Sequence, residues 1–114
     1  MTQNKVMSLL SLATKAGKVA SGEFMVEKTI KEGKAVLVLV ASDASEKTKK
    51  MFRNMCTYYK VPMYIISDKV SLGHEIGREM RAAAAVLDTG FKNAIIKQLE
   101  IINGGSKYGE NENQ

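Results

Sequence analysis

The sequence predicts an α/β domain in which helices cover both faces of a sheet. Residues 35–40 are all apolar, rich in valine and free of glycine and proline, which indicates a strand buried on both faces. A second apolar run, Met63–Ile66, follows the only proline, a residue type tolerated at strand starts. A strand buried on both faces needs helices above and below it. A helical bundle and an all-β sandwich are therefore excluded.

Length and composition restrict the possible classes further. The 114 residues suffice for one hydrophobic core, which we expect over residues 1–103, and the polar residues 104–114 are typical of a disordered tail. The 17 basic and 12 acidic residues give a net charge of +5, which favours an anionic partner, nucleic acid before membrane. No apolar run approaches the ~20 residues of a membrane span, so we expect a cytoplasmic protein. The single cysteine, Cys56, excludes an internal disulfide and a thiolate metal cluster.

The chain before the first strand predicts two helices. The first carries one apolar stripe, Val6, Leu9, Leu10 and Ala13, and ends near Gly17. Residues 18–21 are expected to form only a short extended link. Ser21-Gly22 is typical of a helix start, and Gly33 of its end. The inner face of this second helix is expected to consist of Met25, Val26, Thr29 and Ile30.

Asp43 and Glu46 stand at capping-box spacing and predict a third helix over about residues 44–59. One side of this helix is apolar and the other basic. The apolar stripe is Met51, Phe52, Met55, Cys56 and Tyr59, while Lys47, Lys49, Lys50 and Arg53 are expected to face solvent.

The remainder alternates loops with short elements. Residues 67–69 are expected to be a loop and residues 71–77 a short helix weakened by two glycines. Residues 81–87 are ambiguous, because four alanines favour a helix whereas a compact sheet needs another strand. Residues 88–90 cap a last helix with an apolar side made of Phe91, Ala94, Ile95, Leu99 and Ile102.

Several local motifs together resemble one known family. They include Lys-Ala-Gly-Lys-x-x-x-Gly over residues 15–22, Ala-Ser-Asp over residues 41–43, and single residues further along: Lys28, Gly33, Pro62, Ser67, Lys69, Leu72-Gly73 and Gly77. This pattern resembles the ribosomal protein L7Ae/L30e family, which binds kink-turn RNA. The resemblance covers roughly residues 3–103, and the small stand-alone bacterial members are nearest in size and spacing.

The resemblance implies a three-layer αβα sandwich with a mixed, mostly four-stranded sheet, and it places a strand over residues 81–87. It also implies that RNA is held by the start of the second helix and by two loops. Carried over by position, the RNA-binding residues are Gly22, Glu23, Phe24, Met25 and Lys28, then Ser67, Asp68 and Lys69, then Arg81 and Ala82.

Physical chemistry supports the first of these segments independently. A helix N-terminus offers backbone N–H groups and a partial positive charge, and Gly22 lets a phosphate or a base edge come close. Phe24, Lys28 and Lys31 recur at helical spacing on one face, which suits base stacking on a ring beside two ammonium groups. Lys15 and Lys18 are expected to add positive potential nearby.

The sequence departs from the family at one informative place. Kink-turn binders carry Asn-Glu, which hydrogen-bond guanine edges, where this chain has Phe24-Met25. By analogy with groove readout, the absence of each bidentate pair costs about 1–3 kcal/mol, or roughly ten- to hundredfold in affinity. We therefore expect weakened kink-turn selectivity.

Structural explanations exist for the same residues. Gly22 is consistent with a plain helix cap, Phe24 with a hydrophobic staple and Glu27–Lys31 with a surface ion pair. His74 lies in a different segment from Ser42 and Asp43, and no nucleophile elbow is present, so no catalytic set, cofactor or metal site is predicted. Three hypotheses remain, in this order: a non-catalytic RNA-binding protein with ribosomal RNA as the expected partner, a protein-interaction or self-association module with an apolar face around Phe24 and Met25, and a small-ligand or nucleotide-binding enzyme.

Overall fold

The computed structural model describes residues 2–103, and the polar tail expected over residues 104–114 lies outside them. Helices and strands alternate along most of the chain. In order, the elements are α1 (Thr2–Lys15), β1 (Val19–Ser21), α2 (Glu23–Lys31), β2 (Leu37–Ala41), α3 (Glu46–Tyr59), β3 (Met63–Ile66), α4 (Lys69–Glu75), β4 (Ala83–Val86) and α5 (Thr89–Asn103).

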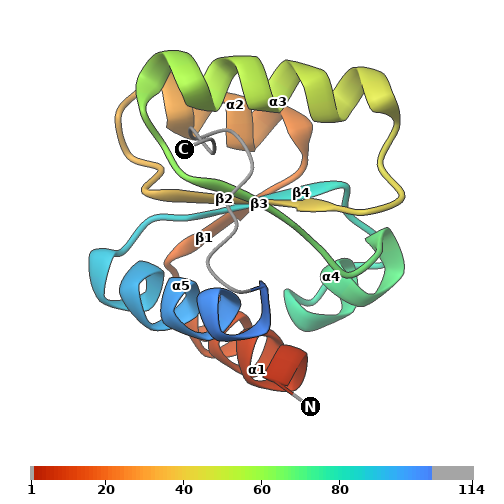
Figure 1. Ribbon diagram of the computed structural model, residues 1–114, viewed down its shortest axis with the longest axis vertical. Helices are drawn as coiled ribbons and strands as arrows, with labels where there is room; N and C mark the ends of the chain where they lie inside the picture. Colours follow the sequence, from red (N-terminus) through yellow and green to blue (C-terminus); the bar gives the residue numbers. More distant parts are fainter. Residues whose placement is uncertain (1, 104–114) are drawn as a thin grey trace.

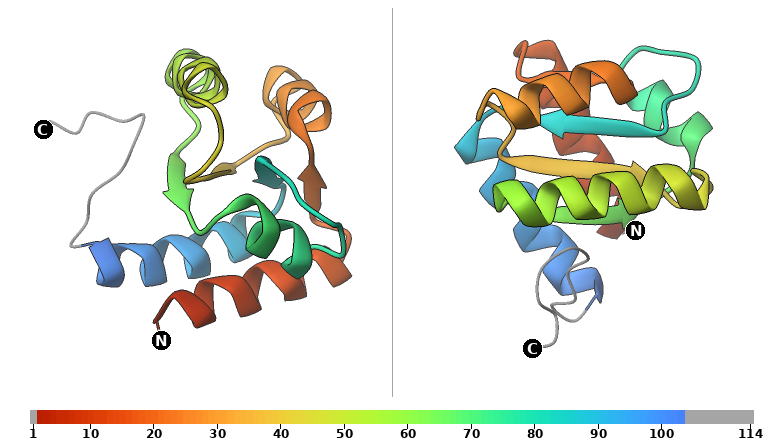
Figure 2. Two further views of the ribbon diagram at one scale, coloured as in Figure 1. Left: turned by 90° about the vertical axis from the view of Figure 1, so that its right-hand side faces the viewer. Right: turned by 90° about the horizontal axis from the view of Figure 1, so that it is seen from above.

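The four strands form one mixed sheet in the order β1-β4-β2-β3. The β2–β3 pair is parallel, whereas β4 is antiparallel to both of its neighbours. Helices α2 and α3 cover one face of the sheet, and α1, α4 and α5 cover the other (Figures 1 and 2). The predicted αβα sandwich with a mixed four-stranded sheet is confirmed.

The central strand β2 divides its side chains between two cores because successive side chains of a strand point to opposite faces. Leu37, Leu39 and Ala41 pack with residues of α1, α4 and α5, while Val38 and Val40 pack with α2 and α3. All five residues of β2 are buried. The prediction of a strand covered on both faces is therefore confirmed.

The alanine-rich segment is a strand, as the family resemblance implies. Residues Ala83–Val86 are all buried between β1 and β2, with helices on both faces. Tertiary packing here outweighs the helix propensity of alanine, because small side chains let the helices approach the sheet closely.

Several local predictions were wrong. The expected link over residues 18–21 contains strand β1, which pairs with β4 at the edge of the sheet. Helix α3 is capped by Ser45, whose hydroxyl accepts a hydrogen bond from the backbone N–H of Thr48 at 3.0 Å, and not by Asp43. Met25 and Tyr59 are 43% and 41% exposed, so they lie at the margins of the apolar faces to which the periodicity assigned them.

Cys56 packs as a small hydrophobe, as expected from its isolation in the sequence. It is buried against the α2/α3 face of the sheet, and burial raises the pKa of its thiol to about 12. A thiol with this pKa stays protonated and unreactive at neutral pH. Within residues 2–103, no helix has the length and apolarity needed to cross a membrane.

Candidate nucleic-acid interface

The three predicted RNA-binding segments meet at one end of the sheet, on the right-hand side of Figure 1. We call this surface the glycine corner and define it as residues 22–25, 41–43, 67–69 and 81–82. Backbone hydrogen bonds join its parts: the N–H of Gly22 donates to the carbonyl of Ala83 (3.1 Å), and that of Arg81 to Lys69 (3.0 Å). The turn after β2 also belongs to this surface, although the resemblance did not assign it to the site. The N–H of Ala41, the last residue of β2, donates to the carbonyl of Ala82 (2.8 Å).

Gly22 is the N-cap of α2 and has a backbone conformation that side chains exclude. Its φ of 90° and ψ of 152° lie in a region occupied almost only by glycine. A Cβ on this residue would lie 3.8 Å from Nε of Arg81, so the guanidinium stem runs directly beside the helix start. The cap interpretation of Gly22 is confirmed, and the same geometry leaves the start of α2 without a capping side chain.

The turn after β2 holds the loop after β3 in place. A carboxylate oxygen of Asp43 accepts a hydrogen bond from the N–H of Lys69 (2.9 Å), and the Ser42 hydroxyl donates to the carbonyl of Ser67. Ser67 has a left-handed φ of 49°, which turns the chain sharply into α4. In the sequence, Asp43 was interpreted as a helix cap, as part of a family motif and as a member of a rejected catalytic set, and not as a residue that holds the loop after β3. Its position at the carboxyl end of a buried strand was the available signal for this role.

The charge of the glycine corner is mixed, although the helix-terminus argument predicted a positive surface. Its segments contain the cations Lys69 and Arg81 and the three carboxylates Glu23, Asp43 and Asp68. Each carboxylate accepts a hydrogen bond: Glu23 from the Thr48 hydroxyl (3.1 Å), Asp43 from the N–H of Lys69 (2.9 Å) and Asp68 from the N–H of Ser71 (2.8 Å). These contacts show that the carboxylates brace the loops and the start of α2.

The outer face of α2 carries the predicted ring and two ammonium groups. Phe24 is 75% exposed, which excludes the hydrophobic-staple interpretation. Lys28 forms an ion pair with Glu32 (3.0 Å), and Lys31 forms the expected pair with Glu27 (2.8 Å). The hydrogen bond that Lys31 donates to Glu27 raises the pKa of Lys31, and the hydrogen bond from Lys28 lowers the pKa of Glu32.

A hollow of about 410 Å³ lies between α2 and the edge strand β1. Met25 and Lys28 line it together with Arg78, a loop residue that sequence reasoning missed. The signal for Arg78 was the pair of arginines at 78 and 81 in a loop that follows Gly77. The hollow thus adds Arg78 to the basic side chains Lys28, Lys69 and Arg81, and Glu32 and Lys34 line it as well.

Lys15 and Lys18 do not lie at the glycine corner. Strand β1 ends at Ser21, beside the corner, whereas Lys18 precedes its first residue and accepts a hydrogen bond from Leu87 at the other end of β4. Four residues of extended chain separate Lys18 from Gly22 by ~13 Å. This separation exceeds the ~8 Å Debye length at physiological salt, so the predicted contribution to the corner's potential is largely screened.

Comparison with known proteins decides the family. The family model described as "Ribosomal protein L7Ae/L30e/S12e/Gadd45 family" matches residues 4–96. The chain belongs to this family. Over 92 residues it is 46% identical to the RNA-binding protein YlxQ of Bacillus subtilis (strain 168), which covers 81% of this chain and 92% of the relative.

Two solved structures show the same fold. A protein with unknown function from Bacillus halodurans C superposes with a TM-score of 0.81 at 33% identity, covering 84% of this chain and 97% of the other. The Giardia lamblia 15.5kD RNA binding protein superposes with a TM-score of 0.76 at 19% identity, covering 90% and 88%. The second likeness, at this low identity, concerns the fold alone. At the start of α2 of this chain, Phe24 and Met25 are 75% and 43% exposed.

Proposed function

We propose that this protein is a non-catalytic, cytoplasmic RNA-binding protein that docks structured RNA, with ribosomal RNA as the expected class, on the glycine corner. The observation that carries the proposal is the convergence of three distant chain segments around Gly22, in the positions that the family resemblance implies for RNA. The name of the YlxQ relative, an RNA-binding protein, supports the same conclusion.

The mode of binding follows from the groups present. The start of α2 offers N–H groups and a partial positive charge to a phosphate, and Gly22 leaves room for its approach beside Arg81. Phe24 offers an exposed ring to an unpaired base, while Lys28 and Arg78 neutralise the backbone on either side of the hollow. Since Phe24 and Met25 form no polar base contacts, we propose that the protein reads RNA shape with less selectivity for kink-turns.

The proposal is tested by filter binding of the purified protein to total RNA at two salt concentrations, with Arg81→Gln and Lys28→Ala beside the wild type. We expect affinity to fall steeply with salt. Each variant should weaken binding and reduce the salt slope by about one unit for each phosphate that is no longer neutralised. Lys47→Ala is the matched control because it removes one exposed charge from α3, outside the corner.

Two results would contradict this function. If no protein retains RNA at low salt, the RNA-binding proposal fails. If association instead survives high salt and is lost in Phe24→Ala, the corner is an interface for a protein partner or a second copy. The exposure of Phe24, Met25 and Met80 is the observation that favours this alternative.

A second prediction concerns the ion pair that competes with RNA for Lys28. Glu32→Gln is expected to strengthen RNA binding a few-fold, because it releases the Lys28 ammonium from the 3.0 Å pair. Lowering the pH acts in the same direction: the pKa of Glu32 lies below its usual value, so the pair persists until the pH falls through that lowered pKa, and protonation then frees Lys28.

The measurement is a titration of one labelled RNA with wild-type protein and Glu32→Gln at neutral pH. Glu100→Gln on α5 removes the same charge on the opposite face of the sheet and serves as the control. Equal affinities for all three proteins would show that the Lys28–Glu32 pair does not limit binding.

A further inference from the structure

A second hollow lies at the end of the sheet opposite to the glycine corner. It has a volume of about 230 Å³ and is bordered by the residues that precede β2 and β3, by the ends of α2 and α3, and by Lys92 of α5. Strands β2 and β3 are parallel, so their first residues share this end and their last residues share the corner. The two ends are separated by the length of β2 and its flanking residues, which is ~20 Å.

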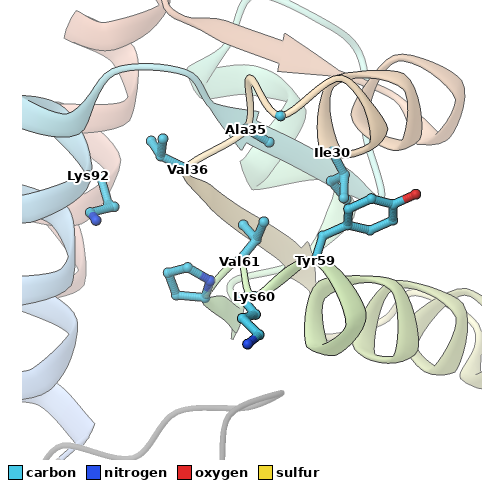
Figure 3. A pocket seen from close by; sticks show the side chains of 9 residues that line it. Ile30, Ala35, Val36, Tyr59, Lys60, Val61 and Lys92 are labelled. Atoms are coloured by element: carbon cyan, nitrogen blue, oxygen red, sulfur yellow. The ribbon is translucent and has the colours of Figure 1, made fainter.

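The walls of this hollow suit a flat apolar ring. Ile30, Ala35 and Val61 are buried and form its floor, and the Tyr59 ring, 41% exposed, forms one side. Figure 3 shows Tyr59 and Lys92 on opposite sides, with Val36 and Val61 between them. An apolar cavity of ~150 Å³ accommodates a benzene ring, whereas drug-sized ligands occupy at least ~300 Å³. The hollow therefore has room for one ring system and not for a large ligand.

Two ammonium groups border the hollow without a carboxylate partner. Among residues with described side chains, neither Lys60 nor Lys92 forms an ion pair, whereas the four lysines Lys28, Lys31, Lys34 and Lys49 each pair with a glutamate. Lys18 lies at the same end of the sheet, before β1. Carboxylates lie at this end too, but Glu32 is paired with Lys28 and Lys34, and Asp88 accepts the N–H of Phe91 at the start of α5. Within the described part of the chain, Lys60 and Lys92 therefore remain as unpaired cations beside an apolar floor.

Lys60 occupies a position where a glycine would have less backbone strain. It ends α3 in the left-handed conformation, with φ 61° and ψ 43°, and the N–H of Val61 closes the turn by donating to the carbonyl of Cys56 at 2.9 Å. Glycine adopts this conformation without a steric penalty and is the usual residue at such helix ends. The conformation of the turn therefore does not by itself favour a lysine at this position.

We propose that this hollow binds one unpaired base of an RNA strand, with the flanking phosphates on Lys60 and Lys92. The base lies on the apolar floor against the Tyr59 ring, a combination of stacking and cations that suits single-stranded RNA. The inference rests on the proposed function and extends it: the protein contacts RNA at both ends of its sheet, with a structured segment at the glycine corner and a single strand at the far end.

The test is fluorescence anisotropy with a labelled twelve-nucleotide oligoadenylate, which has no paired segment, at low and physiological salt. Lys60→Gly is the decisive variant because it removes the ammonium and relieves the left-handed strain, so that stability is expected to be unchanged or higher. We expect Lys60→Gly to weaken oligoadenylate binding several-fold, and Tyr59→Ser by about fivefold or more. Lys47→Ala, on the same helix and with the same change of charge, should bind as the wild type does.

The outcomes separate this inference from the proposed function. If Lys60→Gly and Tyr59→Ser bind oligoadenylate as tightly as Lys47→Ala does, the proposed far-end site is wrong. The proposed function would still stand if the wild type retains total RNA and Arg81→Gln does not. Photocrosslinking of the bound oligonucleotide gives a second readout. Crosslinks to Tyr59 support the inference, whereas crosslinks only to Phe24 overturn it.

Discussion

Replacement of Gly73 by alanine is expected to destabilise the protein by about 1–3 kcal/mol or more, although alanine is the better helix former. Gly73 is buried in α4, and a Cβ on it would lie 2.6 Å from Cα and 2.8 Å from N of Met80. These are backbone atoms, so no rotation of a side chain relieves the overlap. The loop must move away from the helix, and the loss should appear in chemical denaturation and as a fall in Tm of roughly 4–8 °C per kcal/mol.

The same substitution should also weaken RNA binding, because Met80 immediately precedes Arg81, whose N–H donates to Lys69 in the glycine corner. Ser71→Ala, on the same helix, is the control. The backbone N–H of Ser71 donates to Asp68, and the substitution keeps this hydrogen bond. The free energy of unfolding should change by no more than ~0.5 kcal/mol. A Gly73→Ala protein as stable as the Ser71→Ala protein would mean that the loop does not lie so close to α4.

Gly22→Ala is expected to reduce both stability and RNA affinity, for separate reasons. A non-glycine residue with φ 90° and ψ 152° costs about 1–3 kcal/mol of backbone strain. The new Cβ would meet only the Arg81 stem, at 3.8 and 3.9 Å, so packing adds nothing to that cost. The methyl group would instead occupy the approach to the start of α2, and a loss of affinity on the order of tenfold corresponds to ~1.4 kcal/mol.

Substitution of a glycine remote from the glycine corner separates the effect of backbone strain on stability from the effect of the methyl group on RNA affinity. Gly17 has φ 73°, and a Cβ on it would find no atom within 4 Å, so Gly17→Ala carries backbone strain alone. Denaturation of both variants, followed by titration with the same labelled RNA at a temperature where both are folded, distinguishes strain from steric exclusion. Similar affinities for the two variants would refute the role of Gly22 in admitting RNA.

The candidate site was only partly predictable from the sequence. Gly22, Phe24 and the loops around Lys69 and Arg81 were identified from helix-end chemistry and family motifs, and the structure brings them together. Arg78 was missed because no periodicity exists in a loop. Lys15 and Lys18 were assigned to the corner because they are close to Gly22 along the chain, but the direction of β1 places them at the opposite end of the sheet.

Local chemistry was enough to establish the layered α/β architecture. A run of apolar residues without glycine or proline indicates a strand buried on both faces, and apolar stripes with capping residues indicate the helices that cover it. Both signals could be predicted from the sequence because they depend on residues that are close together in the chain. Strand β1 and the strand identity of Ala83–Val86 depend on pairing with distant segments, and neither the three residues of β1 nor the alanine run over residues 82–85 encodes that pairing. Nor does the chain order indicate which lysines meet at which end of the sheet. The end at which each lysine lies depends on the direction of its strand, and this direction is fixed only when the two hydrophobic cores on either side of the sheet pack.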